Sequence, residues 1–432
     1  MRNYLFASVT GALLCTLSPF VSAAEAPGRN THVLLTAEQD RLQAKARRLV
    51  ASDVVQREIG QSIAYLKANH GYLTDKDRTE IEPYVRDLAY CVALVVANSD
   101  PSRPHVLYNG FPGAQYGLVN PDNIYRFIPV SPAYRYRVTG RLGGAAHVSF
   151  ELKDTAPFEG GRLGRNFATL SSEMLKSTPD GAFTIELGSE PANGRANYIQ
   201  LVEGSSLLMI RDTMDDWGAA PMSLQVERVD GQPLPEADDT VLAERAAAGL
   251  AKALRLWIET PYKYNFNIPV NTLPTPRSTG SGGLQGQYNT GGHFSLAEDQ
   301  ALVITLNKGN ARYLGFQLGS NLYVPFEYAR HTSSLTDKQA KPNPDGSYTY
   351  VISLRDPGVA NWLDPVGHRT GLMFIRWQGL ERPLTASEAP IVKLVDVERL
   401  SQALPTGVPR ISPAERQEQL HRRQRDIDLQ RK

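Results

Sequence analysis

The 432-residue sequence predicts a mainly β protein with helical additions, in which two β-sandwich domains follow an N-terminal helical segment. Apolar residues recur at spacings of three and four from Thr36 to Asn98, which is the period of an amphipathic helix. The period changes to two from Tyr134 to Val226 and again from Ala301 to Val397, as half-buried strands require. Short strands separated by turn residues over such lengths are typical of β-sandwiches.

The helical segment, residues 24–98, is expected to contain three helices. Thr36 with Gln39 has the pattern of a capping box, and Ser52 and Thr74 are expected to start the next two helices. Cys91 lies on an apolar helix face, which indicates a small buried side chain and not a reactive thiol.

The first β-sandwich is expected over residues 99–235. Pro, Gly and Asn crowd residues 99–123, which indicates a long ordered connection or a ligand-facing loop. After it, His147, Ser149 and Glu151 alternate with apolar residues, and this pattern predicts a half-buried strand.

A helix capped near Asp238 or Asp239 is expected to pack an apolar stripe against a sheet, and residues 236–270 are expected to bridge the two β domains. Residues 271–293 are rich in Gly, Ser and Thr, which predicts a linker or mobile loop at the start of the C-terminal domain, residues 271–400. The tail, residues 401–432, is highly charged and is expected to be a solvated helix or disordered.

Residues 1–23 have the features of a secretory signal peptide, with a basic Arg2, an apolar run and a cleavage pattern at Val21-Ser22-Ala23. We therefore expect export to the periplasm. Leu14 precedes Cys15 where a lipoprotein signal usually has a small residue, so a lipid anchor is not favoured. Cys15 would leave with the signal, and Cys91 alone cannot form an intramolecular disulfide.

Charge is balanced, with 46 Lys and Arg against 45 Asp and Glu, and removal of Arg2 with the signal makes the two equal. Nucleic-acid and anionic-lipid partners usually require a concentrated basic surface, so neither is predicted. No later apolar run is long enough for a membrane span. The oligomeric state stays open.

Several segments resemble the bacterial uncharacterised-domain family numbered twelve-fourteen. They are Asp122 to Arg126, Tyr134 to Gly140, Asp215-Asp216-Trp217 and the stretch from Asp356 to Trp377. The resemblance implies a jelly-roll-like C-terminal domain preceded by an immunoglobulin-like β domain. It implies no catalytic residues, because none are established for that family.

Catalytic candidates come from the dense polar stretch near the C-terminal end of the second domain. Motifs for a nucleophile elbow, a zinc protease, a phosphate loop or a dinucleotide fold are missing. Asp356, Asp364 or His368 could transfer a proton while Arg376 stabilised negative charge. Turn formation by the two aspartates and an ion pair with Arg376 would explain the same residues.

Ligand contacts are expected from two polar and aromatic groups. The first group lies at the end of the irregular stretch or on the next strand and contains Asp122, Asn123, Tyr125 and Arg137. The second group lies in or near the loops of the second domain and contains Tyr328, Arg330, His331 and Trp362. Turn closure and sheet cover are the alternatives. No cofactor is predicted, although His293, His331 and His368 leave a metal site open.

These observations lead to two hypotheses for function. The first is an exported, cofactor-independent hydrolase or lyase acting on a glycan or small organic compound. The alternative is a periplasmic ligand-binding or accessory protein that holds its ligand between the two sandwiches without breaking a bond. A purely structural role is the third option, so enzymatic activity is left undecided.

Overall fold

The computed structural model describes residues 34–69, 72–156, 159–279 and 283–430. The predicted signal peptide and Cys15 lie outside these residues. A mainly β fold with an N-terminal helical segment is confirmed. No helix in the described ranges is both long and apolar enough for a transmembrane segment.

The helical segment contains α1 (Ala37–Ala51), α2 (Asp53–Asn69), α3 (Asp75–Thr79) and α4 (Ile81–Ala97). Thr36 caps α1 by accepting from the Gln39 amide, but the Gln39 side chain bonds Tyr108 instead of completing a capping box. The third predicted helix is interrupted at Glu80, between α3 and α4. Pro83 follows in the first turn of α4, where its missing N–H could not have continued a helix from α3.

The first sandwich has two sheets with strand orders β1-β2-β8-β4-β5 and β7-β6-β3-β9. Apolar side chains of both sheets, including Phe150, Ile210 and Ile185, form one core between them. Its strands are β1 (Leu107–Asn109), β2 (Asn123–Pro129), β3 (Tyr136–Arg141), β4 (His147–Lys153), β5 (Asn166–Ser171), β6 (Ala182–Gly188), β7 (Tyr198–Gln200), β8 (Leu207–Thr213) and β9 (Ser223–Arg228).

The prediction that the strand around Glu151 is half-buried is wrong. Every residue of β4 is buried, because Val148, Phe150 and Leu152 belong to the sandwich core and the opposite face is also covered by other parts of the chain. Polar residues on the second face, including Ser149 and Glu151, are therefore removed from solvent.

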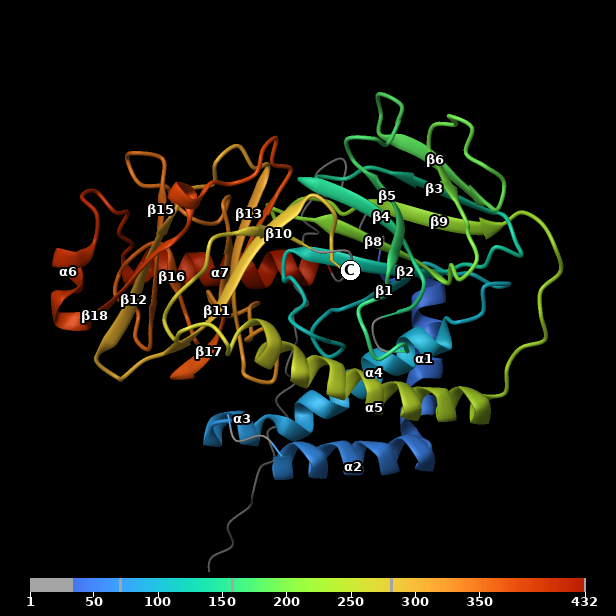
Figure 1. The fold of residues 1–432 in the computed structure, drawn as a ribbon, viewed down its shortest axis with the longest axis horizontal. Helices are drawn as coiled ribbons and strands as arrows, with labels where there is room; N and C mark the ends of the chain where they lie inside the picture. The colour runs from blue at the N-terminus through green and yellow to red at the C-terminus, as the bar shows by residue number, and fades with distance from the viewer. Residues whose placement is uncertain (1–33, 70–71, 157–158, 280–282, 431–432) are drawn as a thin grey trace, which may run out of the picture. The chain divides into compact units, whose positions relative to one another are not determined.

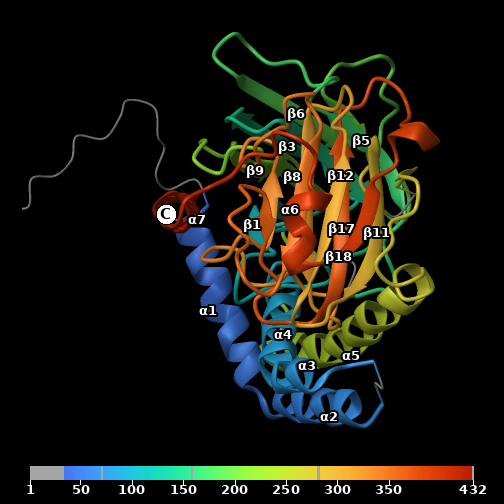
Figure 2. The same cartoon turned by 90° about the vertical axis from the view of Figure 1, so that its left-hand side faces the viewer.

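Helix α5 (Asp239–Tyr264) begins after Asp238, which caps it as predicted. It runs beneath both sandwiches (Figure 1). Its apolar stripe packs mainly on α4 and α2 and shares a buried cluster with sheet residues such as Phe127 and Met209. Trp257, near its C-terminal end, shares a core cluster with Tyr125 of β2. Figure 2 shows α1, α2, α4 and α5 gathered at one end of the β-sandwiches.

The second sandwich pairs sheets with strand orders β10-β11-β17-β13-β14 and β16-β15-β12-β18 around a core that includes Phe316, Tyr350 and Trp377. Its strands are β10 (Arg277–Ser278), β11 (Gln287–Ser295), β12 (Gln300–Leu306), β13 (Tyr313–Gly319), β14 (Ser334–Thr336), β15 (Tyr348–Ser353), β16 (Trp362–Leu363), β17 (Thr370–Gln378) and β18 (Ile391–Asp396). The short helix η1 (Ala386–Glu388) precedes β18, and η2 (Val397–Arg399) and α6 (Leu400–Ala403) follow it.

Two segments are more ordered than predicted. The glycine-rich region includes β10 and β11, and Gly292 fits there because a Cβ would lie 2.3 Å from the Thr272 carbonyl oxygen. The tail forms α7 (Pro413–Gln430), which is neither disordered nor fully solvated. Arg416 and Arg423 are buried, and Arg423 donates to the Tyr328 carbonyl. Side-chain hydrogen bonds therefore compensate for the low apolar content of this helix.

Candidate functional site: a charged cluster beside an aromatic cavity

Three charged side chains lie buried together on the face of the first sheet that meets the helices. Glu151 and Lys153 lie on β4, and Arg211 lies on the neighbouring strand β8. Glu151 Oε2 is 2.7 Å from Arg211 Nη1 and 3.3 Å from Lys153 Nζ. The exposed fractions are 0% for the Glu151 side chain and 2% for that of Lys153. One carboxylate therefore faces two cations away from water.

Strand register explains this arrangement. Glu151 and Lys153 are two residues apart, so they share a face of β4. Arg211 pairs directly with Ser149, which places it diagonal to Glu151 on the same face. The cross-strand neighbour of Glu151 is Met209, whose sulfur accepts from Arg211 Nη2 at 3.5 Å.

The pKa values of the two cations, Lys153 and Arg211, are shifted in opposite directions. Burial raises the pKa of Glu151, but the charges of Arg211 and Lys153 outweigh it and the pKa is lowered overall. Burial lowers the pKa of Lys153, and the Arg211 charge adds to this effect against the attraction of Glu151. Burial also opposes the charge on Arg211, but Glu151 outweighs it and the pKa of Arg211 is raised. Lys153 is therefore the cation that loses its proton more readily.

A cavity of about 150 Å³ adjoins the cluster. Lys153 and Arg211 line it together with the aromatic rings of Tyr116, Tyr125, Trp257 and Tyr323. The Trp257 and Tyr323 rings stack with centroids 6.0 Å apart, and Tyr116 lies 6.1 Å from both Tyr125 and Trp257. Apolar walls with a few convergent polar groups are usual for small-molecule sites, and drug-sized ligands need roughly 300–1,000 Å³. This cavity suits a smaller compound.

Separate parts of the fold bring these rings together. Tyr125 belongs to β2, Tyr116 to the preceding connection and Trp257 to α5. Gly117 makes the approach of that connection feasible, because a Cβ there would lie 2.9 Å from Trp257 Cε3.

Tyr323 comes from a tight turn of the second sandwich. The turn is closed by the Ser320 amide donating to the Val324 carbonyl and the Tyr323 amide donating to the Ser320 carbonyl. Tyr323 has φ of 59°, a left-handed conformation that costs a bulky residue about 1–3 kcal/mol. The surrounding structure holds this strained residue against Trp257, at the wall of the cavity.

Trp257 adds a donor that has no bond in the protein. Its Nε1 is buried without a hydrogen-bond partner among the described residues. A buried donor left unpaired costs about 1–3 kcal/mol, so it requires an explanation. Lys153, Arg211 and the Trp257 side chain all line the same cavity, and the two cations match a ligand that carries acceptor oxygens.

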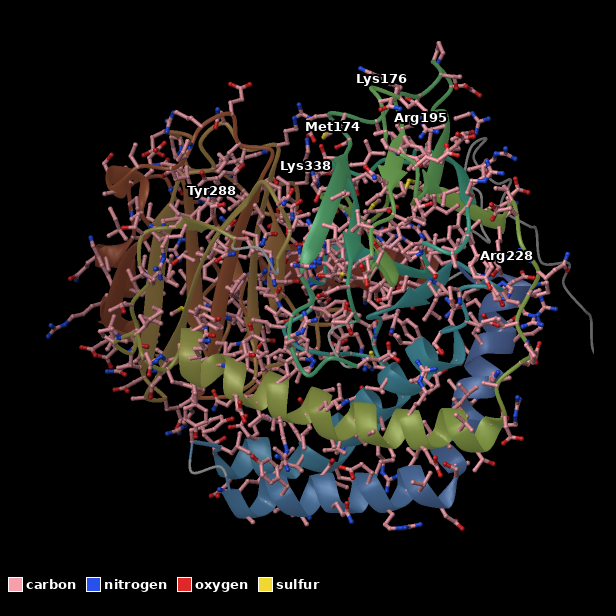
Figure 3. All side chains as sticks on the ribbon, turned by 45° about the vertical axis from the view of Figure 1, so that its right-hand side comes forward. Met174, Lys176, Arg195, Arg228, Tyr288 and Lys338 are labelled. Carbon is pink, nitrogen blue, oxygen red and sulfur yellow. The ribbon has the colours of Figure 1, made fainter. Side chains whose placement is uncertain are left out.

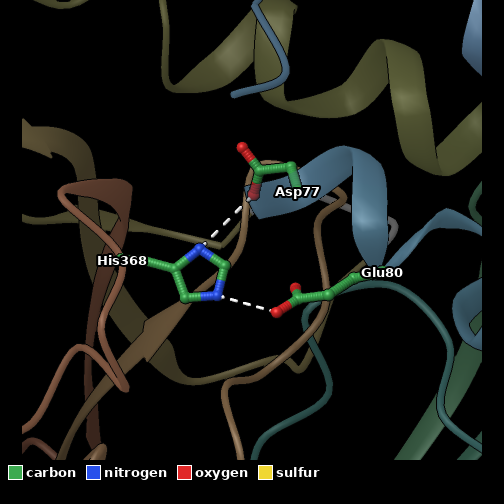
Figure 4. Close-up of side chains that lie close together, drawn as sticks. All are labelled: Asp77, Glu80 and His368. Atoms are coloured by element: carbon green, nitrogen blue, oxygen red, sulfur yellow. Dashed lines mark hydrogen bonds and ion pairs between the residues drawn. The ribbon is translucent and has the colours of Figure 1, made fainter. Parts of the chain in front are cut away.

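A second cluster joins the helical segment to the second sandwich (Figure 4). His368 Nε2 lies 3.0 Å from Glu80 Oε1, and its Nδ1 lies 3.6 Å from Asp77 Oδ1. Asp77 also accepts from Asn321 at 2.9 Å, and the Phe326 ring lies 4.5 Å from the imidazole.

The ligand atoms of Asp77, Glu80 and His368 lie within 4.8 Å of one another, as cation ligands can. Burial lowers the pKa of His368, but hydrogen bonds to Asp77 and Glu80 outweigh it and raise the pKa overall. These contacts of His368 with the two carboxylates fasten the helices to the second sandwich.

The structure gives the four predicted catalytic residues different partners. Asp356 pairs with Arg416 of α7 at 2.9 Å, and its Oδ1 accepts from the Gly358 amide in a turn. Asp364 bonds His331 Nδ1 at 2.7 Å. Arg376 donates to Gln317 and, at 2.9 Å, to the Leu118 carbonyl of the first sandwich. His368 belongs to the cluster with Asp77 and Glu80. These contacts support structural roles, and catalysis by this group stays a prediction.

The predicted ligand-binding residues are also dispersed, and among them Tyr125 lines the aromatic cavity. Asp122 is buried and accepts from Tyr313 at 2.6 Å and from Trp217 at 2.9 Å.

The other predicted ligand contacts have protein partners or lie at the surface. The Asn123 amide faces the Tyr125 hydroxyl, Arg137 pairs with Glu227, Tyr328 packs beside Trp217, the Arg330 amide donates to Glu327, His331 bonds Asp364, and Trp362 donates to the Ser353 carbonyl.

The histidines considered for a metal site do not share one. His293 Nδ1 contacts the Asn265 carbonyl at 3.1 Å, while His331 bonds Asp364 and His368 contacts Asp77 and Glu80.

A larger cleft of about 690 Å³ lies between α7, the segment Asp215–Trp217 and the second sandwich. Lys338, labelled in Figure 3, lines it, together with charged residues of both signs. None of the predicted catalytic residues lines this cleft or the aromatic cavity.

Sequence analysis missed Glu151, Lys153, Arg211 and Trp257 as site residues. The alternation in β4 was recognised, but its polar face was assigned to a half-buried strand. When charged residues occupy one face of a strand and apolar residues the other, the sequence pattern is the same whether the charged face is exposed to solvent or covered by another part of the chain.

Known proteins provide a match in fold. No protein-family model matches this sequence, and no curated protein sequence matches it. The structure is similar to that of an uncharacterised protein from Burkholderia cenocepacia, with a TM-score of 0.72 and 27% identity over 82% of this chain and 99% of the other. A Vibrio parahaemolyticus protein has a TM-score of 0.41 and 12% identity over 73% of this chain and 98% of its own. The resemblance to the uncharacterised-domain family stays a prediction.

Proposed function

We propose that this protein is an exported ligand-binding protein that holds a small organic acid with a flat apolar body in the aromatic cavity. The observation that carries the proposal is the pairing of one buried carboxylate, Glu151, with two cations that line an aromatic cavity. A ligand carboxylate would supply acceptor oxygens and a negative charge to these two cations.

Charge arithmetic supports an anionic ligand. Lys153 and Arg211 place two cationic side chains at the cavity, in a site with almost no solvent contact. An incoming carboxylate would form charge-assisted hydrogen bonds with them. Arginine suits this role because its planar donors match the geometry of a carboxylate.

Ring placement supports a flat body. Tyr116, Tyr125, Trp257 and Tyr323 give the cavity aromatic walls on several sides. Such walls favour planar or unsaturated groups, since stacked and edge-on ring contacts add about 0.5–1.5 kcal/mol beyond buried area. Their position between the first sandwich, α5 and a turn of the second sandwich agrees with the expectation of a ligand held between the domains.

The hydrolase or lyase hypothesis has less support. It depends on Asp364, His368 and Arg376 acting together, whereas each of these side chains is engaged with a different partner. Export remains part of the proposal on the strength of the signal-like residues 1–23.

Thermal-shift measurements with benzoate, benzamide and hexanoate test the proposal. Benzoate is expected to raise the melting temperature most, because benzamide lacks the charge and hexanoate lacks the flat ring. Equal stabilisation by benzamide would contradict the electrostatic argument, and no response to any small carboxylate would refute the proposed function.

The variant Trp257→Phe tests the site itself. It keeps an aromatic ring but reduces the wall that stacks on Tyr323, so benzoate affinity should fall by about 0.5–1.5 kcal/mol, or roughly two- to tenfold. Trp362→Phe is the matched control, because Trp362 Nε1 donates to the Ser353 carbonyl away from the cavity. Equal losses in the two variants would remove the cavity from consideration.

A further inference from the structure

We propose that Lys153 forms an imine with the carbonyl carbon of a small 2-oxo acid bound in the aromatic cavity, while Arg211 holds the carboxylate of that acid. This inference rests on the proposed ligand-binding function and narrows its ligand class. It also adds a covalent step at a residue that binding alone would use only as a cation.

Geometry distinguishes the two cations. Arg211 Nη1 lies 2.7 Å from Glu151 Oε2, and Lys153 Nζ lies 3.3 Å from the same oxygen. Arg211 thus has the closer ion pair, and its guanidinium cannot act as a nucleophile because it keeps its proton. Lys153 lines the cavity and can lose its proton, so a carbonyl carbon bound there could approach its amine.

Local chemistry supports an uncharged amine. A lysine becomes nucleophilic when it is desolvated or lies beside another cation, and both conditions hold at Lys153. Its side chain is 2% exposed and its pKa is lowered by burial, with Arg211 acting in the same direction.

The step balances with these groups alone. The Lys153 ammonium first passes one proton to Glu151, and its nitrogen lone pair then forms a C–N bond to the carbonyl carbon. The C=O π electrons move to oxygen, which takes that proton from Glu151. Glu151 takes a proton from the new ammonium nitrogen and returns it to the hydroxyl group, which leaves as water. The product is a protonated imine, a cation that Glu151 would stabilise at the position where it now contacts Nζ.

A 2-oxo acid fits both ends of the site. Its carboxylate lies next to its carbonyl carbon, so an arginine that holds the first would present the second to a neighbouring lysine. The carboxylate and the carbonyl carbon of a 2-oxo acid are adjacent, which matches the closeness of Arg211 and Lys153, since both contact the same oxygen of Glu151. The small cavity, about 150 Å³, favours short or compact members of the class.

Reductive trapping tests the inference. The full-length chain is incubated with pyruvate or phenylglyoxylate and cyanoborohydride, and the modified peptide is located by mass spectrometry. One adduct on Lys153 is expected, and the unreactive 2-hydroxy acids lactate and mandelate should suppress it by occupying the cavity. Lys153→Arg should abolish the adduct, whereas Lys176→Met, at an exposed lysine labelled in Figure 3, should not.

The outcomes separate this inference from the binding proposal. Stabilisation by 2-oxo acids without a Lys153 adduct would overturn imine formation and leave ligand binding intact. Adducts spread over surface lysines, unaffected by mandelate, would also overturn it. If 2-oxo acids produce no stabilisation and no adduct, both imine formation and ligand binding are overturned. Peptide mapping locates the adduct in the wild-type protein. The result therefore does not depend on whether Lys153→Arg folds.

Discussion

Replacing Glu151 by Gln removes the carboxylate that both buried cations share while keeping the size of the side chain. In the wild type, Arg211 Nη1 and Lys153 Nζ lie 2.7 Å and 3.3 Å from Glu151 Oε2. Removing one partner of a buried ion pair costs about 3–5 kcal/mol. Domains are typically stable by about 5–15 kcal/mol, so we expect a folded but clearly weakened variant.

The loss should depend on pH in a defined direction. Without Glu151, Lys153 loses the attraction that opposes its burial, so its pKa in the folded state falls further below the ordinary value of 10.5. The unfolded chain then binds more protons than the folded one, and stability rises with pH until the unfolded lysine also titrates. The difference between Glu151→Gln and wild type should therefore shrink as pH approaches 10.5.

An added carboxylate should partly restore the variant. Benzoate in the cavity would replace the missing negative charge, so it should raise the melting temperature of Glu151→Gln more than that of wild type. Urea denaturation with and without benzoate measures both effects, and benzamide serves as the neutral control. A loss below about 1 kcal/mol, or equal stabilisation of the two proteins by benzoate, would refute the description of this cluster as one carboxylate compensating two buried cations.

Three further predictions concern residues outside the cavity. His368→Gln should reduce stability most at low pH, because the raised pKa of His368 contributes stability that is complete below its ordinary value of 6.5 and lost as pH rises through the folded value; pH-dependent melting checks this, and a constant difference would contradict it. Burial raises the pKa of Asp122 to about 6, so Asp122→Asn should match wild type at low pH and exceed it above pH 6 by up to about 3 kcal/mol in urea denaturation; a variant that is less stable there would show that the charged form is favourable. Arg423→Met should destabilise the protein by about 2–5 kcal/mol because it leaves the Tyr328 carbonyl without its donor, whereas exposed Arg422→Met should change stability by less than about 0.5 kcal/mol; similar melting temperatures would mean that α7 is not held by Arg423.

Periodic segments could be predicted from sequence because their side-chain pattern is local. The alternation at Phe183, Ile185 and Leu187 predicted β6, and the stripe from Leu242 to Ile258 predicted α5 with its cap at Asp238. The break at Glu80 was missed, because it depends on how Pro83 interrupts a hydrogen-bond ladder in an otherwise helical pattern.

Predicting the site failed for a different reason. The many polar residues between Asp356 and Trp377 suggested a site at Asp356, Asp364 and Arg376. The structure pairs these side chains with groups from other parts of the chain, namely Arg416, His331 and the Leu118 carbonyl. Short polar side chains near Pro and Gly are equally suited to turns and to catalysis, and only the contacts distinguish the two.

The sequence by itself determined the secondary-structure periods, the mainly β class and the balance of charge, because these depend on the order and type of neighbouring residues. Tertiary structure alone decided that the polar face of β4 is buried and does not meet water. It also brought Tyr323 of one sandwich against Trp257 of α5, beside Lys153 and Arg211 of the other sandwich. Burial of Glu151 between two cations follows from that layering, since solvent exposure is a property of the assembled layers and not of any single strand.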